Sequence, residues 1–129
     1  MMNEYVYEHY HKFDNDCDDL YKKCSSLKTD LIRLKKSLND DIVLLNGKIP
    51  TNSTYFHVNN LKAKLPIFKV KKFRCQSINR GNRSKFRIIF AYNQSESLIY
   101  FIEIYYKKND KTEMNRKRAI EACEFICNP

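Results

Sequence analysis

The sequence predicts an α+β fold in which helices cover an antiparallel β-sheet. Three observations lead to this fold class: leucines recur at helical spacing in residues 27–38, aromatic and β-branched residues dominate residues 68–106, and a helical pattern returns near the C-terminus. The chain has 129 residues with two Gly and three Pro, a size and composition typical of a single domain. We therefore assign residues 1–129 to one domain.

The chain begins with a predicted strand and a short helix. Residues 4–13 are rich in β-favouring side chains that partly alternate, which indicates a strand. Asp14 can then cap a helix whose first turn is acidic, as the positive end of a helix dipole favours. The expected buried face of this helix comprises Phe13, Cys17, Leu20 and Cys24.

A second helix is expected directly afterwards. Ser25 and Ser26 interrupt the first helix and can cap the next one. The two helices are joined by a very short turn, so they are expected to form an antiparallel hairpin that lays an apolar stripe on a flat partner. That stripe consists of Leu27, Leu31, Leu34 and Leu38.

The middle of the chain is expected to hold an irregular connection and then a three-stranded meander. Residues 46–66 contain one Gly, two Pro and many polar residues, with a short apolar piece at Tyr55 and Phe56. The predicted strands of the meander are residues 68–75, 85–92 and 98–106.

The alternation of apolar and polar residues within the three strands predicts which side chains share a face of the sheet. In the first strand the alternation slips at Lys71–Lys72, which suggests a bulge. The third strand is apolar on both faces, as expected for a central strand. The second strand carries one apolar row, which consists of Phe86, Ile88, Phe90 and Tyr92.

A final helix is expected to begin near Glu113–Asn115 and to run to about Ile126. With all helices on one face of the sheet, the other face would remain open and positive near Arg74 and Arg87. The buried face of the final helix is expected to comprise Ala119, Ile120, Cys123 and Ile126.

Positive charge is concentrated in the second half of the chain. The net charge is +9, but residues 1–61 carry −1, residues 62–118 carry +12 and residues 119–129 carry −2. Basic residues interleaved with core aromatics favour a face that binds a polyanion. A solvated lysine surface is the alternative that this distribution leaves open.

The five cysteines suit buried helix faces better than a metal site. Neither a Cys-x-x-Cys pair nor a Cys–His ligand spacing is present. We therefore predict small core cysteines in a reducing compartment, with no metal or other cofactor. The polar residues 1–12 and the lack of a long apolar run predict a cytoplasmic protein without membrane association.

Three segments carry landmarks beyond their secondary structure. They are Lys23–Leu31 at the junction of the two helices, Phe73–Cys75 with Gly81–Tyr92 in the first hairpin, and Ile99–Lys111. In this order they resemble the RelE/ParE superfamily of toxins from bacterial type II toxin–antitoxin systems, over Phe13–Ile126. The resemblance implies a RelE-like fold: two N-terminal helices packed on an antiparallel sheet with a three-stranded meander and a C-terminal helix.

The resemblance also implies a metal-independent, ribosome-dependent mRNA endoribonuclease that blocks translation. In the RelE branch, a ribose 2′-hydroxyl attacks the neighbouring phosphate of messenger RNA on the ribosome. This reaction needs a base for the hydroxyl, cations for the charge that develops at phosphorus, and an acid for the departing 5′-oxygen. Lys and Arg side chains can supply the cationic charge.

The same resemblance indicates which cationic residues form the site. Arg87 matches the arginine on the middle strand of the meander, and it would grip the scissile phosphate at two points. Arg74 matches a basic position on the preceding strand, beside Arg87, and Lys108 lies in the basic turn after the last strand. These three are the expected catalytic residues. Looser RNA contacts are expected from Lys71, Arg80, Arg83, Lys107 and Lys111.

The acid and the base are not identified by the sequence. Many RNA-cutting members carry a Tyr or His near the C-terminus, but Asp110–Met114 contains neither. Tyr105 and Tyr106 are expected to pack in the sheet. The three histidines, His9, His11 and His57, are expected on the surface outside the site.

The resemblance implies three partners: a cognate antitoxin protein, mRNA on the ribosome and, for the toxin–antitoxin complex, operator DNA. Two other functions stay open at this point. One is a ParE-like inhibitor of DNA gyrase without nuclease activity, which the shortage of acid and base candidates favours. The other is a member that binds its antitoxin without catalysis.

Overall fold

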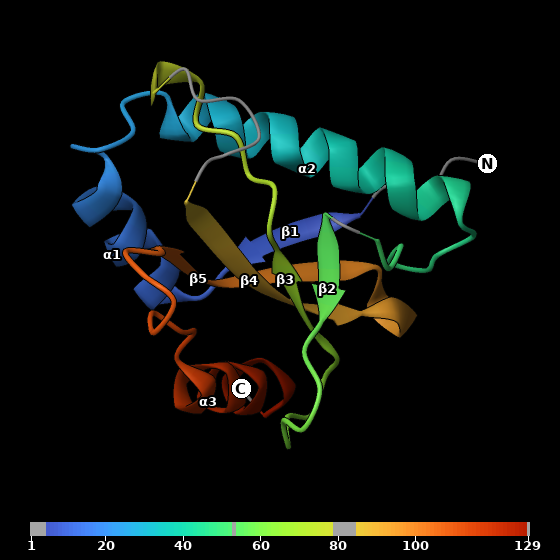
Figure 1. The fold of residues 1–129 in the computed structure, drawn as a ribbon. Coiled ribbons are helices and arrows are strands. Elements are labelled where there is room, and N and C mark those ends of the chain that lie inside the picture. The colour runs from blue at the N-terminus through green and yellow to red at the C-terminus, as the bar shows by residue number, and fades with distance from the viewer. Residues whose placement is uncertain (1–4, 53, 79–84, 129) are drawn as a thin grey trace.

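A five-stranded sheet with the strand order β1-β5-β4-β3-β2 separates two helical layers (Figure 1). The computed structural model describes residues 5–52, 54–78 and 85–128. Its strands are β1 (Val6–His9), β2 (Tyr55–His57), β3 (Ile67–Val70), β4 (Phe86–Asn93) and β5 (Leu98–Tyr106). Its α-helices are α1 (His11–Leu20), α2 (Leu27–Leu44) and α3 (Arg116–Cys127). The predicted α+β class is confirmed, but the sheet is mixed because β1 runs parallel to β5.

Strand β5 lies at the centre of the fold. It pairs with β1 on one side and with β4 on the other, and its residues from Leu98 to Ile104 are all buried. The prediction of a central strand that is apolar on both faces is therefore confirmed. The predicted apolar row of β4 is also confirmed, because all four of its side chains belong to the core shared with α1 and α2.

A β-bulge changes the alternation of β5 in the middle of the strand. The register shifts between Ile89 and Phe90 of β4, which leaves Ile102 as an extra residue in β5. Ile102 packs into the core beneath α3. After the bulge, Glu103 pairs with Ile89, and Tyr105 follows on the same face. The bulge therefore sets the face on which Tyr105 lies.

The chain before β4 differs from the prediction at two places. Within the connection predicted for residues 46–66, strand β2 forms the sheet edge and pairs with β3. The strand predicted for residues 68–75 ends at Val70, and the chain then leaves the sheet. The slip in alternation at Lys71–Lys72 thus marks the end of β3, and the predicted bulge there is wrong.

Helix α2 buries the predicted leucine stripe. All four leucines, and Ile42 further along the helix, lie in the core on one face of the sheet. Ser26 occupies the N-cap position but makes no side-chain capping bond. None of the helices in the described part of the chain has the length and hydropathy that a membrane span requires.

Helix α1 begins earlier than predicted. Its N-cap is Tyr10, which makes no side-chain capping bond, and Asp14 lies within the first turn instead of capping the helix. Phe13 is completely buried, as predicted. Figure 1 shows α1 running steeply across the direction of α2, so the predicted antiparallel hairpin is wrong.

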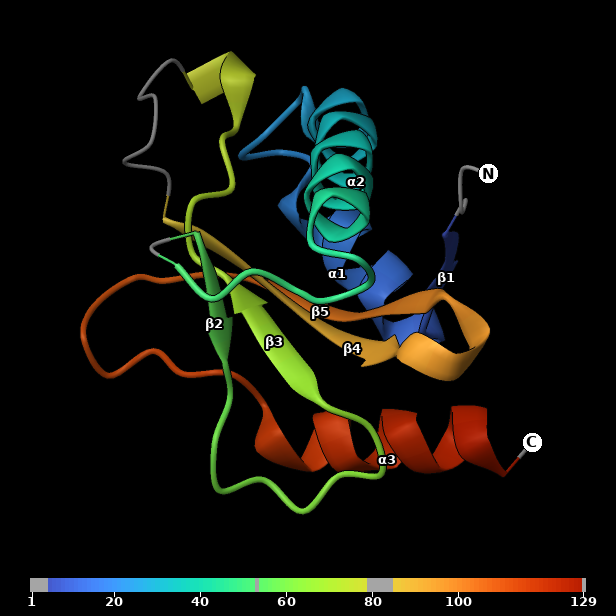
Figure 2. The ribbon, with the colours of Figure 1, turned by 90° about the vertical axis from the view of Figure 1, so that its right-hand side faces the viewer.

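Helix α3 lies on the opposite face of the sheet from α2, which corrects the prediction that all helices share one face (Figure 2). The helix starts after Asn115, whose side chain accepts the backbone N–H of Arg118 at 3.0 Å. Ala119, Ala122 and Cys123 are completely buried against the sheet. Small side chains at the contact allow α3 to pack closely on the strands.

A polar cluster links α1, β5 and the start of α3. The guanidinium of Arg118 pairs with both carboxylate oxygens of Asp16, at 2.5 and 3.3 Å, and donates to the carbonyl of Ile102 at 3.3 Å. The carboxylate of Glu103 accepts the backbone N–H of Asn115 at 2.8 Å. Burial raises the pKa of Glu103. These contacts fix the position of the loop that precedes α3.

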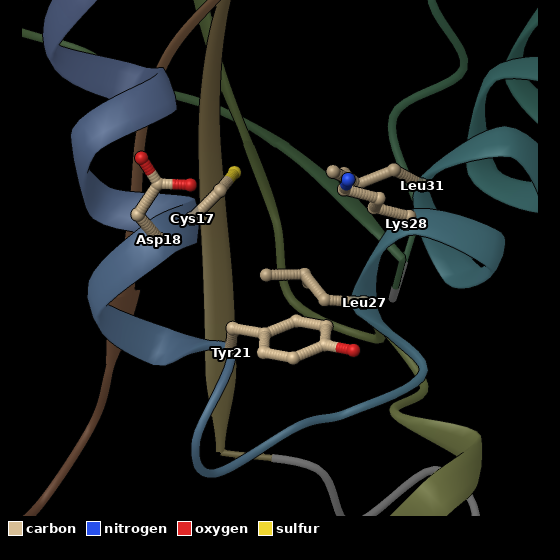
Figure 3. Close-up of a pocket in the computed structure, with 6 residues that line it drawn as sticks. All are labelled: Cys17, Asp18, Tyr21, Leu27, Lys28 and Leu31. Atoms are coloured by element: carbon tan, nitrogen blue, oxygen red, sulfur yellow. The ribbon is translucent and has the colours of Figure 1, made fainter.

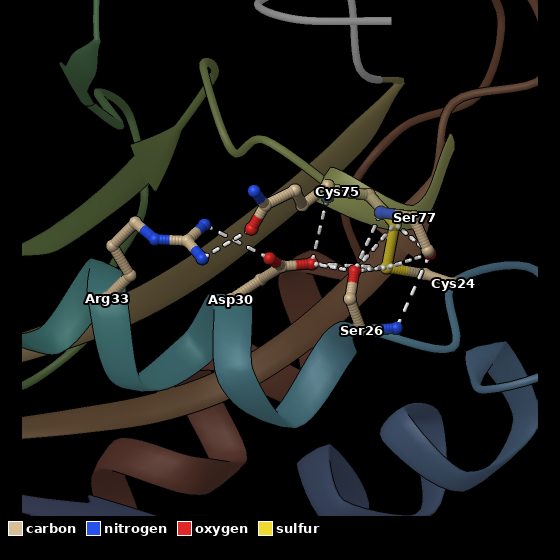
Figure 4. The surroundings of a disulfide bond; sticks show 7 residues. Cys24, Ser26, Asp30, Arg33, Cys75 and Ser77 are labelled. Carbon is tan, nitrogen blue, oxygen red and sulfur yellow. Dashed lines mark hydrogen bonds and ion pairs between the residues drawn. A yellow bond between two sulfur atoms is a disulfide. The ribbon is translucent and has the colours of Figure 1, made fainter. Parts of the chain in front are cut away.

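Cys24 and Cys75 form a disulfide, which corrects the prediction that all five cysteines are reduced core residues (Figure 4). The bond joins the turn before α2 to the segment after β3, across a sequence separation of 51 residues. The remaining cysteines, Cys17, Cys123 and Cys127, are free thiols.

The carboxylate of Asp30 lies beside the disulfide and is buried. It accepts hydrogen bonds from the hydroxyl of Ser26 at 2.6 Å, the backbone N–H of Gln76 at 3.2 Å and the guanidinium of Arg33 at 3.1 Å. Arg33 also donates to the side chain of Gln76 at 2.7 Å. The disulfide and this network together fasten residues 75–77 to the start of α2 (Figure 4).

Reduction of the disulfide is expected to destabilise the protein. Without the disulfide, the unfolded chain regains the conformational entropy that the closed loop had removed. This lowers the free energy of unfolding by roughly 4 kcal/mol. Thermal unfolding of the Cys24→Ser/Cys75→Ser variant should match that of reduced wild type, well below oxidised wild type. The control Cys17→Ser should keep the full response to reductant. Identical melting temperatures of wild type with and without reductant would contradict the disulfide.

Candidate nucleic-acid interface

One face of the sheet packs against α3. The part of this face that lies beyond the apolar contacts of α3 carries basic side chains. Beneath α3, this surface consists of core residues such as Ile89 and Ala91. Three residues lie on the same face as Ile89 and Ala91, towards the other end of the strands. They are Lys69 on β3, Arg87 on β4 and Tyr105 on β5. All three side chains are partly exposed.

Arg87 and Tyr105 are directly opposite each other in the register of β4 and β5. The next residue of β4 on this face, Ile89, is completely buried, so the polar surface begins at Arg87. Nη1 of Arg87 donates to the carbonyl of Phe86 at 3.1 Å, which holds the guanidinium near its own strand. Sequence alternation predicted this projection from the sheet, and the structure agrees.

Lys69 lies within reach of the other positive charges of this surface. Burial lowers the pKa of its ammonium group, and the positive charges of Lys71, Lys107 and Arg87 lower it further. The carboxylate of Glu113 acts in the opposite direction. A lysine with a lowered pKa gives up its proton more readily than an ordinary surface lysine, so Lys69 is suited to proton transfer as well as to anion binding.

Two further lysines flank this group. Nζ of Lys107 donates to the carbonyl of Thr112 at 3.0 Å, which ties the ammonium to the turn after β5. Lys71 follows β3 directly, and its Nζ lies 4.5 Å from the centroid of the Phe56 ring. The Phe56 side chain is 44% exposed at the edge of the sheet. A flat aromatic ring thus stands next to the basic residues.

The phenol of Tyr105 is a hydrogen-bond donor at neutral pH. Burial, reinforced by the carboxylates of Glu103 and Glu113, raises its pKa to about 12, although Arg87 acts in the opposite direction. The side chain packs partly against the core beneath α3, as predicted. It cannot serve as a general base at neutral pH, because its deprotonated form is too scarce.

A cleft of about 440 Å³ opens beside these residues, between the β2–β3 edge and the loop before α3. Its apolar parts are Phe56, Val58 and Met114, of which the last two are buried. Its polar lining combines both signs of charge with an amide and consists of Asn59, Lys69, Glu113 and Arg116. Lys69 therefore belongs both to the cleft and to the cationic surface.

The predicted residue Arg74 lies elsewhere. It lines a cleft of about 160 Å³ whose other wall is formed by α2, including Asp30 and Arg33. Helix α2 covers the opposite face of the sheet from α3, so the expectation that Arg74 lies beside Arg87 is not met. The cause is the early end of β3 at Val70, after which the chain turns towards α2.

The remaining predicted site residues are placed unevenly. Arg80 and Arg83 lie outside the described residues. Lys108, the third expected catalytic residue, and Lys111 are exposed in the turn between β5 and α3, close in sequence to Lys107. The structure thus groups Arg87, Lys71 and Lys107 around Lys69, and it separates Arg74 from them.

The histidines have contacts of their own away from the cationic group. Nδ1 of His9 lies 2.9 Å from Asp14, and the His9 ring packs on Phe13 in the α1 layer. The ring of His57 packs on Phe68, on the face of the sheet that α2 covers. His9 thus lies away from the cationic group, whereas Nδ1 of His57 lies 2.9 Å from the side chain of Asn59, which lines the cleft described above.

A second hollow, of about 230 Å³, lies between α1 and α2 (Figure 3). Cys17, Asp18 and Tyr21 of the α1 side face Leu27, Lys28 and Leu31 of α2. Burial and nearby aspartates raise the pKa of the Cys17 thiol to about 12, so it is protonated and a poor nucleophile at neutral pH. This hollow offers less chemistry than the cationic surface.

Tyr105 was expected only to pack in the sheet, and four further residues of the site escaped the sequence analysis: Phe56, Lys69, Glu113 and Arg116. Lys69 stands in a basic run in which charge alone does not distinguish one lysine from another. Its position in phase with Ile67, on the same face as Arg87, was the available signal. The other three come from a short edge strand, a loop and the first residue of α3, where periodicity carries little information.

Comparisons with known proteins add no family assignment. No model of a known protein family matches the chain, and no curated protein matches its sequence significantly.

Proposed function

We propose that this protein is the toxin of a type II toxin–antitoxin pair and acts as a metal-independent, ribosome-dependent mRNA endoribonuclease. The observation that carries the proposal is the group formed by Lys69, Arg87 and Tyr105 on one sheet face, with Lys71 and Lys107 beside it. Cations around a hydrogen-bond donor suit a phosphate whose charge increases during the reaction. The RelE-like fold implied by the sequence is part of this proposal.

The cations bind and stabilise the scissile phosphate. The guanidinium of Arg87 can engage two phosphate oxygens at once, and Lys69 adds a compact charge next to it. The phenol of Tyr105, which stays protonated, can donate to a phosphate oxygen. Together they oppose the negative charge that builds up when the ribose 2′-hydroxyl attacks phosphorus.

Proton transfer to the leaving group is assigned to Lys69. The proton of the 2′-hydroxyl passes to water as the oxygen attacks phosphorus. The ammonium of Lys69, with its lowered pKa, can donate a proton to the departing 5′-oxygen. The reaction then leaves a 2′,3′-cyclic phosphate and a 5′-hydroxyl without consuming water.

The proposal includes a cytoplasmic site of action and a cognate antitoxin that covers the cationic surface. Disulfides are rare and usually transient in the cytoplasm of mesophiles, so the thiol form of Cys24 and Cys75 must also be active there. Arg87 and Tyr105 are positioned by the pairing of β4 with β5, and neither cysteine belongs to these strands. Loss of the disulfide should therefore reduce stability without removing the site.

Replacement of Arg87 by alanine is expected to abolish toxicity and mRNA cleavage on induced expression. The variant loses the guanidinium that engages the phosphate, and cleavage should fall by at least about 100-fold, as for other oxyanion donors. Primer extension on a reporter mRNA measures the cuts. Lys36→Ala, on the exposed side of α2, is the matched control and should cleave like wild type.

The outcomes separate the candidate functions. Full cleavage by a folded Arg87→Ala protein would remove this residue from the site. Wild type that spares mRNA and translation but stops DNA supercoiling would identify a gyrase inhibitor and reject the nuclease. Toxicity that persists without either effect would reject both.

Replacement of Lys69 by arginine should change the pH dependence of cleavage. If the ammonium of Lys69 is the acid, the rate for wild type falls as pH rises through its lowered pKa. An arginine keeps the charge but does not titrate in this range, so the rate of Lys69→Arg should be lower and its alkaline decline should disappear. Single-turnover cleavage on ribosomes at a series of pH values measures this. An unchanged alkaline decline would assign the acid to another group.

A further inference from the structure

The cleft between the β2–β3 edge and the loop before α3 adjoins the group of cations. Lys69 lines the cleft, and the charges of Arg87, Lys71 and Lys107 all act on it. A ligand whose phosphate lies on these cations can therefore extend its remaining part into the cleft. A volume of about 440 Å³ lies within the range of about 300–1,000 Å³ that small-molecule sites occupy.

The lining suits a flat ring with polar edges. Phe56 presents a partly exposed aromatic ring, and Val58 and Met114 contribute buried apolar side chains. Lys71 lies against the Phe56 ring and adds positive charge beside the aromatic surface. Aromatic side chains next to cationic groups are the usual means by which proteins bind unpaired bases.

The rim of the cleft is fixed. Nη2 of Arg116 donates to the carbonyl of Asn59 at 2.8 Å and to that of Asn60 at 3.4 Å. The side chain of Asn59 is in turn 2.9 Å from Nδ1 of His57. The loop after β2 is thereby joined to the first residue of α3, so the two walls of the cleft are held at a set separation.

The acidic residue of the cleft gives it a preference among bases. A carboxylate only accepts hydrogen bonds and can accept two parallel ones. Guanine presents two adjacent donors, N1–H and the N2 amino group, on its Watson–Crick edge. Adenine and cytosine each present a single amino group there, and uracil presents a single N–H. Glu113 therefore favours guanine.

We infer that this cleft binds one unpaired nucleotide of the RNA substrate, with Phe56 stacking on the base and Glu113 selecting guanine. The inference rests on the proposed function and extends it, because it assigns the sequence preference to residues separate from Arg87. Lys69 places the nucleotide's phosphate next to the proposed catalytic cations.

Binding can be measured without cleavage. The full-length protein, isotopically labelled, is titrated by NMR with 2′-O-methyl trinucleotides that differ only in a central G, A or U, up to millimolar concentration. Wild type should bind the G trinucleotide at least about fivefold more tightly than the others. Phe56→Ala should bind all of them about tenfold more weakly, since base–aromatic stacking is lost. Glu113→Gln should bind the three trinucleotides about equally.

Matched controls come from α3. Phe125 is also an exposed aromatic residue, at 59%, and Glu121 is an exposed glutamate, so Phe125→Ala and Glu121→Gln should behave like wild type. Arg87→Ala should weaken binding of all three trinucleotides without changing the preference for G. If Phe56→Ala and Glu113→Gln bind like wild type while Arg87→Ala is weakened, the cleft is not the base site and the proposed function stands. If wild type binds none of the trinucleotides, the base site is rejected, whereas the proposed function is decided separately by the cleavage of the reporter mRNA.

Discussion

The register between β4 and β5 is the constraint on which the candidate site depends. It sets Arg87 opposite Tyr105, and the bulge at Ile102 brings Tyr105 to the face of the sheet on which Arg87 lies. If Ile102 instead paired with Ile89 in regular register, the β5 residues after it would lie on the opposite face, and Tyr105 would no longer be opposite Arg87. The same bulge supplies Ile102 to the core beneath α3. One irregularity thus serves the packing of the helix and the position of the polar residues beyond it.

The division of the sheet face follows from the way α3 is attached. Its small buried residues bring it close to the strands, and the contacts of Arg118 and Glu103 fix where it starts. The loop before α3 then carries Glu113 to the cleft that Lys69 also lines. Burial, reinforced by the neighbouring positive charges, lowers the pKa of Lys69. The positive charge on the surface that the helix leaves uncovered favours an anionic ligand.

The sequence predicted the elements that have a strong hydrophobic periodicity. It did not predict the features that depend on which distant segments lie close together in space. The leucine stripe, the apolar row of β4 and the span of β5 were all found from spacing. The side on which α3 packs was not, because both faces of the sheet are apolar. The disulfide was missed because the spacing of Cys24 and Cys75 says nothing about their distance in space. Arg87 was placed correctly by alternation, whereas Arg74 was misplaced because β3 ends before it.

The central claim is that Lys69 and Arg87 together hold RNA phosphate, and the salt dependence of RNA binding tests it most directly. Each phosphate contact on single-stranded RNA contributes about 0.7 to the slope of log affinity against log salt concentration. The Lys69→Ala/Arg87→Ala variant should therefore bind a 2′-O-methyl oligonucleotide with a slope that is smaller than that of wild type by about 1.4. An unchanged slope in the folded double variant would show that these two cations do not contact the RNA backbone.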